Sequence, residues 1–561
     1  MREKKYSIGI DYGTNSVRAV VVDIRNGNVV GEDVFAYPSG NAGVIVDAKN
    51  PNQARQNPAD YVQGLRTVLK KAVQDASLRD PEFRPDAVAG IGTDTTASTP
   101  IPVDAEGIPV AFQEEFKNDP DACAWLWKDH TSIEEAKEIT RWASECPENF
   151  TSKCGGTYSS EWYWAKILHC VRTAPRVAAA TASWVELADF VPGWLTGKTA
   201  PDVVPRGICT AGHKALYHES WGGLPSVESL ARLDERLCRF RYASKAVSVN
   251  QKVGTLLPEI ALEVGLPPET AVAVGAIDCH LGAIGCGIRP GMLIQTMGTS
   301  TCDIMVAPIP ENQPELAIPG LCGIVPGSVL PGMFGFEAGQ AAVGDLFNWF
   351  VENLTPTAFT ADGNPHAALT EEAARLAPGA SGLLALDWSN GNRTILGDQD
   401  LTGLLIGQTI RTTAPEVFRA LIEATAFGAR MIISQFEKFG VRVEEVVNCG
   451  GIADKNDFIM QIYADVCDRP MKVSRSSQTC ALGAAITGAV AGGAYDSYEA
   501  AFAEMTGVRE KVFQPRPDAV KVYDRLFRLY STLHDAFGKT GKVLPMAEVM
   551  KELIAIRRET R

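Results

Sequence analysis

The same local pattern occurs twice in this sequence, once near its start and again near its middle. Residues 8–23, IGIDYGTNSVRAVVVD, form an apolar strand, a short turn with glycine and hydroxyl side chains, and a second apolar strand. Residues 291–308, GMLIQTMGTSTCDIMVAP, repeat this order with Gly-Thr-Ser in the turn. The chain has 561 residues, whereas a single hydrophobic core stops growing at roughly 250–300 residues. The repeat therefore predicts two large halves that each open with a hairpin.

Strands and helices alternate in the segments that follow each hairpin. Asn26-Gly27 is a strong signal for a tight hairpin turn, and Asn57-Pro58 is typical of a helix start. Small residues at close spacing in 477–493 predict a tightly packed helix, and the tail from 508 to 561 predicts a charged surface helix. The order is that of an α/β protein. The remaining predicted elements are strands 5–11, 16–24, 28–36 and 86–96, helices 57–76 and 413–440, and a strand, Gly-Gly turn and helix over 443–470.

The composition excludes several classes of protein. A formal net charge of −14 leaves no basic surplus to neutralise nucleic-acid phosphates, so an anionic ligand must be held by local dipoles or a metal ion. The 13 cysteines include no C-x-x-C pair, which argues against a zinc ribbon and favours reduced thiols in the cytosol. The N-terminus has no apolar signal region, and no run of about 18 apolar residues predicts a membrane span. We expect a cytoplasmic protein.

The turn of the first hairpin permits two interpretations. Gly13 gives a phosphate close access to backbone amides, and Thr14 adds a hydroxyl donor. Asp11 does not attract an anion by itself, but it fits if Mg²⁺ lies between the two. The alternative is an ordinary hairpin in which Asp and Asn are turn formers. This turn alone leaves the two interpretations about equal.

The second hairpin favours the phosphate interpretation. Gly298, Thr299 and Ser300 occupy its turn, and two hydroxyl-bearing hairpins that face each other can grip opposite ends of a polyphosphate. A third glycine turn, Gly450-Gly451, lies between a predicted strand and helix, where bare backbone can receive an adenosine. The alternative is that these two glycines only allow the helix to pack closely against the strand.

Five segments together resemble the FGGY family of carbohydrate kinases, which belongs to the actin/Hsp70/sugar kinase superfamily. The similarity runs in order along the whole chain. It implies an α/β fold with two ribonuclease H-like, actin-like ATPase domains flanking a cleft. Residues 1–288 are then the domain with the sugar site, first phosphate loop and catalytic Asp, and residues 289–561 the nucleotide-binding domain. The segments are IGIDYGTNSVRAVVVD, YSSEWYWAKILH (158–169), VGAIDCHLGAIG (274–285), MGTSTC (297–302) and CGGIADKNDFIMQIYADV (449–466).

The resemblance also implies roles for individual residues. Asp278 matches the catalytic base, although its place where a strand meets a helix also suits a helix cap. The positions that match sugar contacts are Ala97, Trp127, Lys214 and Glu337. The ordinary alternatives are that the tryptophan lies in the core, that the lysine has its charged head in water and that the glutamate is solvated. Asp11 is expected to face Mg²⁺ through water. The positions that match ATP contacts are Gly13, Thr14, Asn15, Arg18, Gly298, Thr299, Gly344, Asn348, Gly450, Gly451 and Asn456.

Four further segments resemble family members that phosphorylate L-ribulose: 90–104, 125–130, 210–218 and 336–350. We therefore expect ATP-dependent conversion of L-ribulose to L-ribulose 5-phosphate, as in L-arabinose catabolism. The alternatives are a kinase for another ketopentose or polyol, such as D-ribulose or xylulose, and a non-catalytic actin- or Hsp70-like nucleotide switch. A switch has no use for a sugar pocket, so the sugar-contact residues disfavour it. The resemblance also implies a homodimer.

Overall fold

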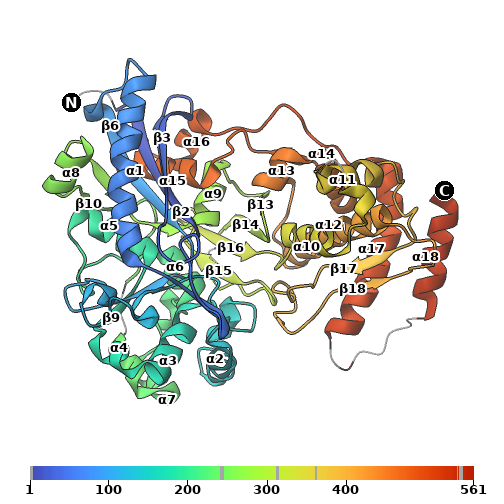
Figure 1. Cartoon of the computed structure of the whole chain (residues 1–561), viewed down its shortest axis with the longest axis horizontal. Coiled ribbons are helices and arrows are strands. Elements are labelled where there is room, and N and C mark those ends of the chain that lie inside the picture. Colours follow the sequence, from blue (N-terminus) through green and yellow to red (C-terminus); the bar gives the residue numbers. More distant parts are fainter. Residues whose placement is uncertain are drawn as a thin grey trace.

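Two large sheets, one in each half of the chain, form the framework of the molecule (Figure 1). The computed structural model describes residues 4–240, 245–310, 315–360, 363–539, 541 and 547–560. We call residues up to 288 the first half and those from 289 the second half. In the described residues, no helix is both long enough and apolar enough to cross a membrane.

The first sheet has the strand order β10-β11-β6-β1-β2-β3, with β12 also paired to β6. The predicted hairpin is present, because β1 and β2 pair antiparallel while β1 pairs in parallel with β6. The bounds are β1 Tyr6–Tyr12, β2 Ser16–Asp23, β3 Asn28–Ala36, β6 Val88–Thr95, β10 Lys252–Thr255, β11 Ala271–Ala273 and β12 Ala276–Ile277.

The second sheet repeats this plan with the order β15-β16-β14-β13-β19-β20. Here β13 and β14 form the antiparallel hairpin, and β13 pairs in parallel with β19. The predicted repeat of the opening motif is therefore confirmed in three dimensions. The bounds are β13 Met292–Met297, β14 Thr301–Pro308, β15 Gly323–Pro326, β16 Met333–Ala338, β19 Glu445–Cys449 and β20 Met471–Val473.

Helices cover the first sheet and build a large insertion beside it. Helix α1 (Pro58–Arg79) begins where Asn57 accepts a hydrogen bond from the Ala59 amide at 3.0 Å, as its sequence predicts. The other first-half helices are α2 Ile133–Glu145, α3 Tyr163–Thr173, α4 Pro175–Ala180, α5 Leu187–Thr196, α6 Ile208–Lys214, α7 Val227–Leu233, α8 Pro258–Val264 and α9 Asp278–Gly285. The small sheets of this half pair β4 (Ile45–Asp47) with β5 (Asn50–Gln56), β5 with β8 (Ala124–Trp125), and β7 (Pro100–Val103) with β9 (Ser183–Glu186).

The second half is mostly helical around its sheet. The predicted helix at 413–440 is present as α12 (Ala414–Lys438). The other elements are α10 Gly344–Leu354, α11 Pro365–Ala374, α13 Gly451–Lys455, α14 Asp457–Cys467, α15 Thr479–Ala491, α16 Tyr498–Met505, α17 Pro517–Gly538 and α18 Ala547–Thr560, with a small sheet of β17 (Leu384–Leu386) and β18 (Leu404–Ile406).

The prediction that the tail is a surface element is wrong for α17. Its residues Tyr523, Leu526 and Tyr530 are buried in the core of the second half. The sequence is amphipathic, and its apolar face packs against the rest of this half while only its charged face meets solvent. Residues 540, 542–546 and 561 of the predicted tail lie outside the described residues.

Helix α15 belongs to the second half but packs on the sheet of the first, and Figure 1 shows it with α9 between the two sheets. The approach is very close: a Cβ on Gly9 of β1 would lie 1.8 Å from the Ala481 carbonyl oxygen, and one on Gly483 would lie 1.7 Å from that of Leu281. The Ser7 hydroxyl donates to the Ala485 carbonyl at 2.7 Å. The expected tight packing of residues 477–493 is confirmed, and it joins the two halves.

Candidate active site between the two halves

Three carboxyl groups gather at one edge of the first sheet. Asp11 is the last residue but one of β1 and is paired in parallel register with Asp94 of β6, and Asp94 is paired with Ala276 of β12. Asp278 follows two residues later as the first residue of α9. The carboxyl ends of parallel strands are where α/β proteins bind ligands. Asp11 and Asp278 are predicted site residues, whereas Asp94 is not, although it lies in the glycine-rich end of a predicted strand.

The three carboxyls change one another's acidity. Burial, then the neighbouring Asp11 carboxylate, raises the pKa of Asp278 from 3.8 to about 7. Burial and the charges of Asp11 and Asp278 raise the pKa of Asp94 well above its usual value. Burial also raises the pKa of Asp11, against the opposing effects of Asp94 and Arg18. Asp278 therefore titrates close to neutral pH, the range that suits a general base.

The cap interpretation of Asp278 holds only in part. The side chain accepts a hydrogen bond from the next amide, that of Cys279, at 2.6 Å. Asp278 is itself the first helical residue, however, and the N-cap position belongs to Ile277. One carboxylate oxygen is thus fixed by the helix start, which orients the group without making it a conventional cap.

Lys214 and Glu337 form a buried ion pair that joins the halves. The Lys214 ammonium, at the end of α6, donates to both oxygens of Glu337 on β16, at 2.7 and 3.0 Å. Burial alone would lower the pKa of Lys214, but Glu337 reverses this and raises it; burial would raise the pKa of Glu337, but Lys214 holds it far below its usual value. Both groups are therefore charged. The alternatives of a lysine head in water and a solvated glutamate are wrong, because the two residues are only 5% and 7% exposed.

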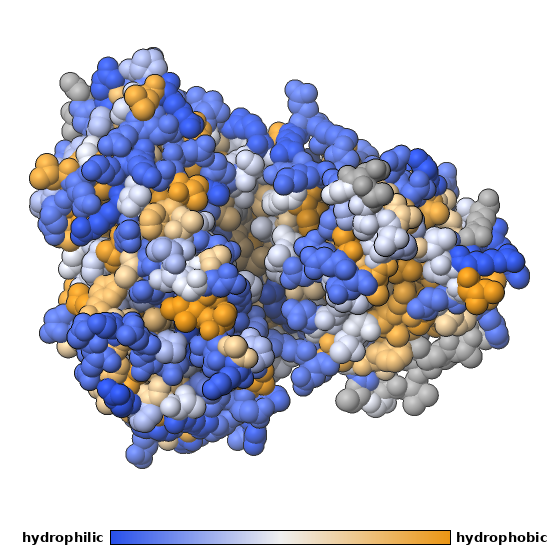
Figure 2. Space-filling view, viewed as in Figure 1, coloured by the Kyte–Doolittle hydropathy of each residue, from blue (hydrophilic) through white to orange (hydrophobic). Residues whose placement is uncertain are grey.

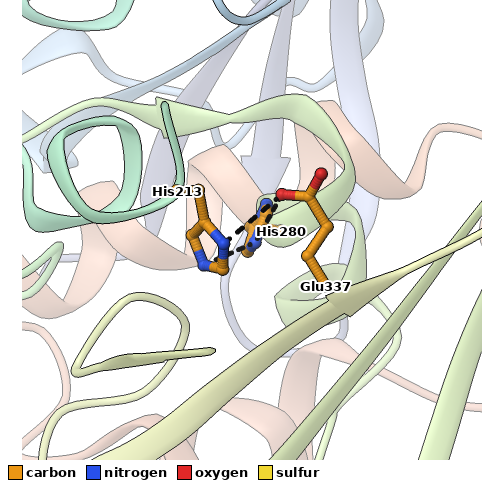
Figure 3. A group of neighbouring side chains, drawn as sticks. All are labelled: His213, His280 and Glu337. Atoms are coloured by element: carbon orange, nitrogen blue, oxygen red, sulfur yellow. Dashed lines mark hydrogen bonds and ion pairs between the residues drawn. The ribbon is translucent and has the colours of Figure 1, made fainter. Parts of the chain in front are cut away.

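Two histidines lie beside Glu337 of this pair (Figure 3). The Nε2 atoms of His213 and His280 lie 3.2 Å apart, and His213 Nδ1 and His280 Nε2 lie 3.5 and 3.7 Å from Glu337 Oε2. Burial lowers the pKa of both rings, that of His280 to about 4, so both are neutral near pH 7. Sequence reasoning missed both, although His213 precedes Lys214 and His280 follows Asp278 by two residues.

The potential ligand atoms of His213, His280 and Glu337 all lie within 4.8 Å of one another, close enough to hold a metal ion. The Lys214 ammonium already contacts both Glu337 oxygens, however. A metal cation here would lie beside this ammonium, and like charges in a buried place repel strongly. We interpret the group as a hydrogen-bonded network that holds Glu337 in place.

The turn between β1 and β2 closes a hairpin and also contacts Trp127, a predicted sugar contact. The Gly13 amide donates to the Ser16 carbonyl at 3.0 Å, and Arg18 lies 3.9 Å from Asp11. The indole of Trp127 donates to the Thr14 hydroxyl at 3.0 Å, which connects a predicted sugar contact to a predicted phosphate contact. Trp127 is only partly buried, so it is not a core tryptophan. The Asn15 amide of the same turn donates to the Ala42 carbonyl at 2.6 Å.

A buried lysine connects the loops that carry Ala97 and Trp127. The Lys166 ammonium donates to the carbonyls of Ser98 at 2.7 Å and Leu126 at 2.8 Å, each next to one of these residues. Burial lowers the pKa of Lys166 to about 7. Sequence reasoning did not place Lys166 in the site, since nothing in the sequence indicates which carbonyls a buried lysine contacts.

The glycine turns of the second half converge on one another. The Gly344 amide, at the start of α10, donates to the Gly298 carbonyl at 3.0 Å, and the Val343 amide donates to that of Thr299 at 2.8 Å. Gly450 has a φ of +91°, and a Cβ on it would lie 2.6 Å from the Met297 carbonyl oxygen. The Gly298-Thr299 turn, which is predicted to bind phosphate, and the Gly450-Gly451 turn thus adjoin at the ends of β13 and β19.

The two asparagines predicted to contact ATP have different surroundings. Asn348 is exposed on α10, one turn after Gly344. The Asn456 side chain instead accepts a hydrogen bond from the Ile459 amide at 3.1 Å and caps α14. Gly451 is exposed, with nothing within 4 Å of where its Cβ would lie, so the backbone there is open to a flat ligand.

Two side-chain contacts near Asp278 cross between the two halves. The space-filling view shows a recess between the two lobes of the molecule (Figure 2). The Lys214–Glu337 pair crosses between the halves, and Cys279, next to Asp278, contacts Cys302 at the start of β14 with the sulfurs 3.1 Å apart. Asp278 therefore lies close to the β13–β14 hairpin, whose turn contains Gly298 and Thr299.

Two family models match the chain. The FGGY family of carbohydrate kinases, N-terminal domain, matches residues 6–285, and the C-terminal domain of the same family matches residues 293–492. Among curated proteins, "Ribulokinase" of Halalkalibacterium halodurans is 40% identical over 99% of this chain and 98% of its own length. "Ribulokinase" of Geobacillus thermodenitrificans is 42% identical over 98% and 97%. That of Mycolicibacterium smegmatis is 39% identical over 99% and 98%.

Solved structures share the fold at lower identity. The xylulose kinase of Rhodospirillum rubrum aligns with a TM-score of 0.76 at 24% identity, over 95% of this chain and 98% of that one. The glycerol kinase of Plasmodium falciparum, solved with ADP, aligns with a TM-score of 0.74 at 16% identity, over 97% and 99%. The three chains therefore share the same overall fold.

Proposed function

Because the chain belongs to the FGGY family of carbohydrate kinases, we propose that it transfers the γ-phosphoryl group of ATP to L-ribulose, forming L-ribulose 5-phosphate and ADP. Relatives named ribulokinase, 38–42% identical over nearly the whole chain, support ribulose as the substrate. The L configuration rests on the resemblance of the sugar-contact segments.

The observation that carries the proposal is the position of Asp278. It titrates near pH 7, and the buried charges of Lys214 and Glu337 are close enough to change its pKa. An ammonium and a carboxylate fixed side by side offer a donor and an acceptor to adjacent oxygens of a polyhydroxylated ligand. An actin- or Hsp70-like switch would need the phosphate turns but not this pair.

In the proposed reaction, Asp278 accepts the proton of the sugar's terminal hydroxyl while that oxygen attacks the γ-phosphorus. The new O–P bond forms as the bond from the γ-phosphorus to the bridging oxygen breaks, and ADP leaves with the bonding electrons. Trp127 and Ala97 border the sugar, and Lys214 and Glu337 orient it. In this proposal, backbone amides of the turns that contain Gly13 and Gly298 donate hydrogen bonds to phosphate oxygens, so catalysis is mainly positioning and charge neutralisation.

We propose that Mg²⁺ accompanies ATP, with Asp11 as its nearest protein group through water. The donor set fits: the charge of Asp11 raises the pKa of Asp278, and the charges of both raise the pKa of Asp94, as neighbouring negative charges do. Mg²⁺ prefers a few carboxylates together with phosphates and retained waters. When bound, it would neutralise phosphate charge and the charge of these carboxyls.

The test is a coupled assay of ADP release with L-ribulose, D-ribulose, D-xylulose and glycerol as separate acceptors. We expect kcat/KM to be highest for L-ribulose and ADP release without any acceptor to be slow. A higher kcat/KM for another sugar would reassign the substrate, and ATP hydrolysis equally fast without a sugar would favour the nucleotide switch.

We also propose a cytoplasmic homodimer, on the family resemblance alone. Light scattering after size exclusion would give about twice the mass of one chain, 60.3 kDa. A single-chain mass across micromolar concentrations would contradict the dimer.

A further inference from the structure

Two cysteine side chains meet between the halves, one residue away from Asp278. Cys279 follows Asp278 on α9 of the first half, and Cys302 lies on β14 of the second half. Their sulfur atoms are 3.1 Å apart, and both residues are partly exposed and carry free thiols. The proposed catalysis uses neither thiol.

The geometry suits a bond between them. A disulfide has an S–S distance of about 2.05 Å, so the sulfurs need to approach by about 1 Å. A second thiol contact, between Cys286 and Cys449, is almost fully buried at 4% and 1% exposure. An oxidant in solution therefore reaches the Cys279–Cys302 pair more readily than the Cys286–Cys449 pair.

We propose that Cys279 and Cys302 form a reversible disulfide that links the two halves and switches the protein off under oxidising conditions. The oxidant is a low-molecular-weight disulfide, RS–SR. The Cys302 sulfur, as thiolate, attacks one sulfur of RS–SR and releases RS⁻. The Cys279 sulfur then attacks the Cys302 sulfur of this mixed disulfide and releases the second RS⁻. The two protein thiols lose two protons and two electrons, and RS–SR takes these up to become two RSH.

A proton acceptor for the second step lies beside Cys279. His280 Nδ1 lies 3.5 Å from the Cys279 sulfur. The neutral ring of His280 is placed to accept the Cys279 proton in the second step.

The disulfide would disturb the reaction in two ways, and this part rests on the proposed function. The Cys279 amide holds one oxygen of Asp278 at 2.6 Å, so drawing Cys279 toward β14 displaces the base. Misplacement of a reacting group by about 1 Å costs roughly 100-fold in rate. The covalent link also prevents the halves from separating, and sugar kinases that close around their substrate must open to release product.

The test incubates the whole protein with 2-hydroxyethyl disulfide, then measures kinase activity and maps peptides without reduction. We expect at least a tenfold loss of kcat, recovery with dithiothreitol, and a linked peptide that contains Cys279 and Cys302. Cys279→Ala and Cys302→Ser should keep their activity under the same treatment. Cys238→Ser removes a thiol that lies elsewhere, on the 3₁₀ helix Glu235–Phe240, and should lose activity as the wild type does.

Inactivation without the linked peptide would overturn the proposal. So would inactivation of Cys279→Ala and Cys302→Ser to the same extent as the wild type. A linked peptide in fully active protein would also overturn it, because the bond would then not be a switch. Peptide mapping of the wild type decides whether the bond forms even if a variant folds poorly. If the reduced protein phosphorylates no ketopentose, the proposed function fails, whereas the mapping still decides the disulfide.

Discussion

Replacing Asp278 by Asn should greatly slow catalysis and stabilise the protein. The pKa of Asp278 is 3.8 in an unfolded chain and about 7 in the folded protein. Below pH 3.8 the carboxyl is protonated in both states and does not affect stability. Between pH 3.8 and 7 the unfolded chain loses this proton while the folded protein keeps it, so the unfolded state is increasingly favoured. Above pH 7 the cost is constant.

The size of this cost follows from the difference between the two pKa values. At 1.36 kcal/mol per pH unit, the change from 3.8 to about 7 amounts to roughly 4 kcal/mol at pH 8. Because Asp278 is only partly buried, we expect about half of this. Asn keeps an oxygen for the Cys279 amide, which donates at 2.6 Å, so the fold loses little else. Activity should fall by about 10²–10⁴-fold, the usual contribution of a general base.

The assay is urea unfolding of wild type and Asp278→Asn without ligands, at pH 8, 7, 6 and 5. The variant should be more stable by about 2 kcal/mol at pH 8, and the difference should shrink toward zero as the pH falls toward 4. The control is Asp518→Asn, whose side chain is 98% exposed on α17 and which should change neither quantity. A variant that turns over normally, or a stability difference that does not vary with pH, would refute the reasoning.

Three further predictions concern pH, a buried lysine and a helix contact. In the wild type, kcat/KM should rise with pH, and the midpoint of the rise should lie near pH 7, because only about 1% of Asp278 is ionised at pH 5. A kcat/KM that does not change with pH in the ADP-release assay would contradict the role of Asp278 as base. Lys166→Met should raise the KM for the sugar at least tenfold while leaving that for ATP within about twofold, since it frees the loops carrying Ala97 and Trp127; an equal rise in both constants would point to general misfolding. Gly483→Ala should lower the unfolding free energy by about 3 kcal/mol or more in urea titrations, because its Cβ would meet the Leu281 carbonyl oxygen at 1.7 Å. Gly507→Ala, with its nearest atoms at 3.5 Å, is the matched control; equal effects would contradict the packing argument.

The local features of this protein were predictable from its sequence. The hairpin at residues 16–36, the helix that begins after Asn57 and the repeated glycine-hydroxyl turns follow from side-chain periodicity and turn chemistry, which act between neighbours in the chain. The position of Asp278 at a strand-to-helix junction was predictable in the same way. Its assignment as the base came from family resemblance.

Tertiary structure alone decided which side chains meet and how they ionise. Asp94 joins Asp11 only because β1 and β6 pair in parallel, and His213 and His280 meet only because α6 and α9 both reach Glu337 of the other half. The expected surface tail became core for the same reason: an amphipathic pattern shows that a helix buries one face, not what covers it. Burial and Coulomb interactions depend on distance in space and not on separation along the chain. The sequence therefore determined the turns and the candidate base, and only the packed structure determined the pKa of that base.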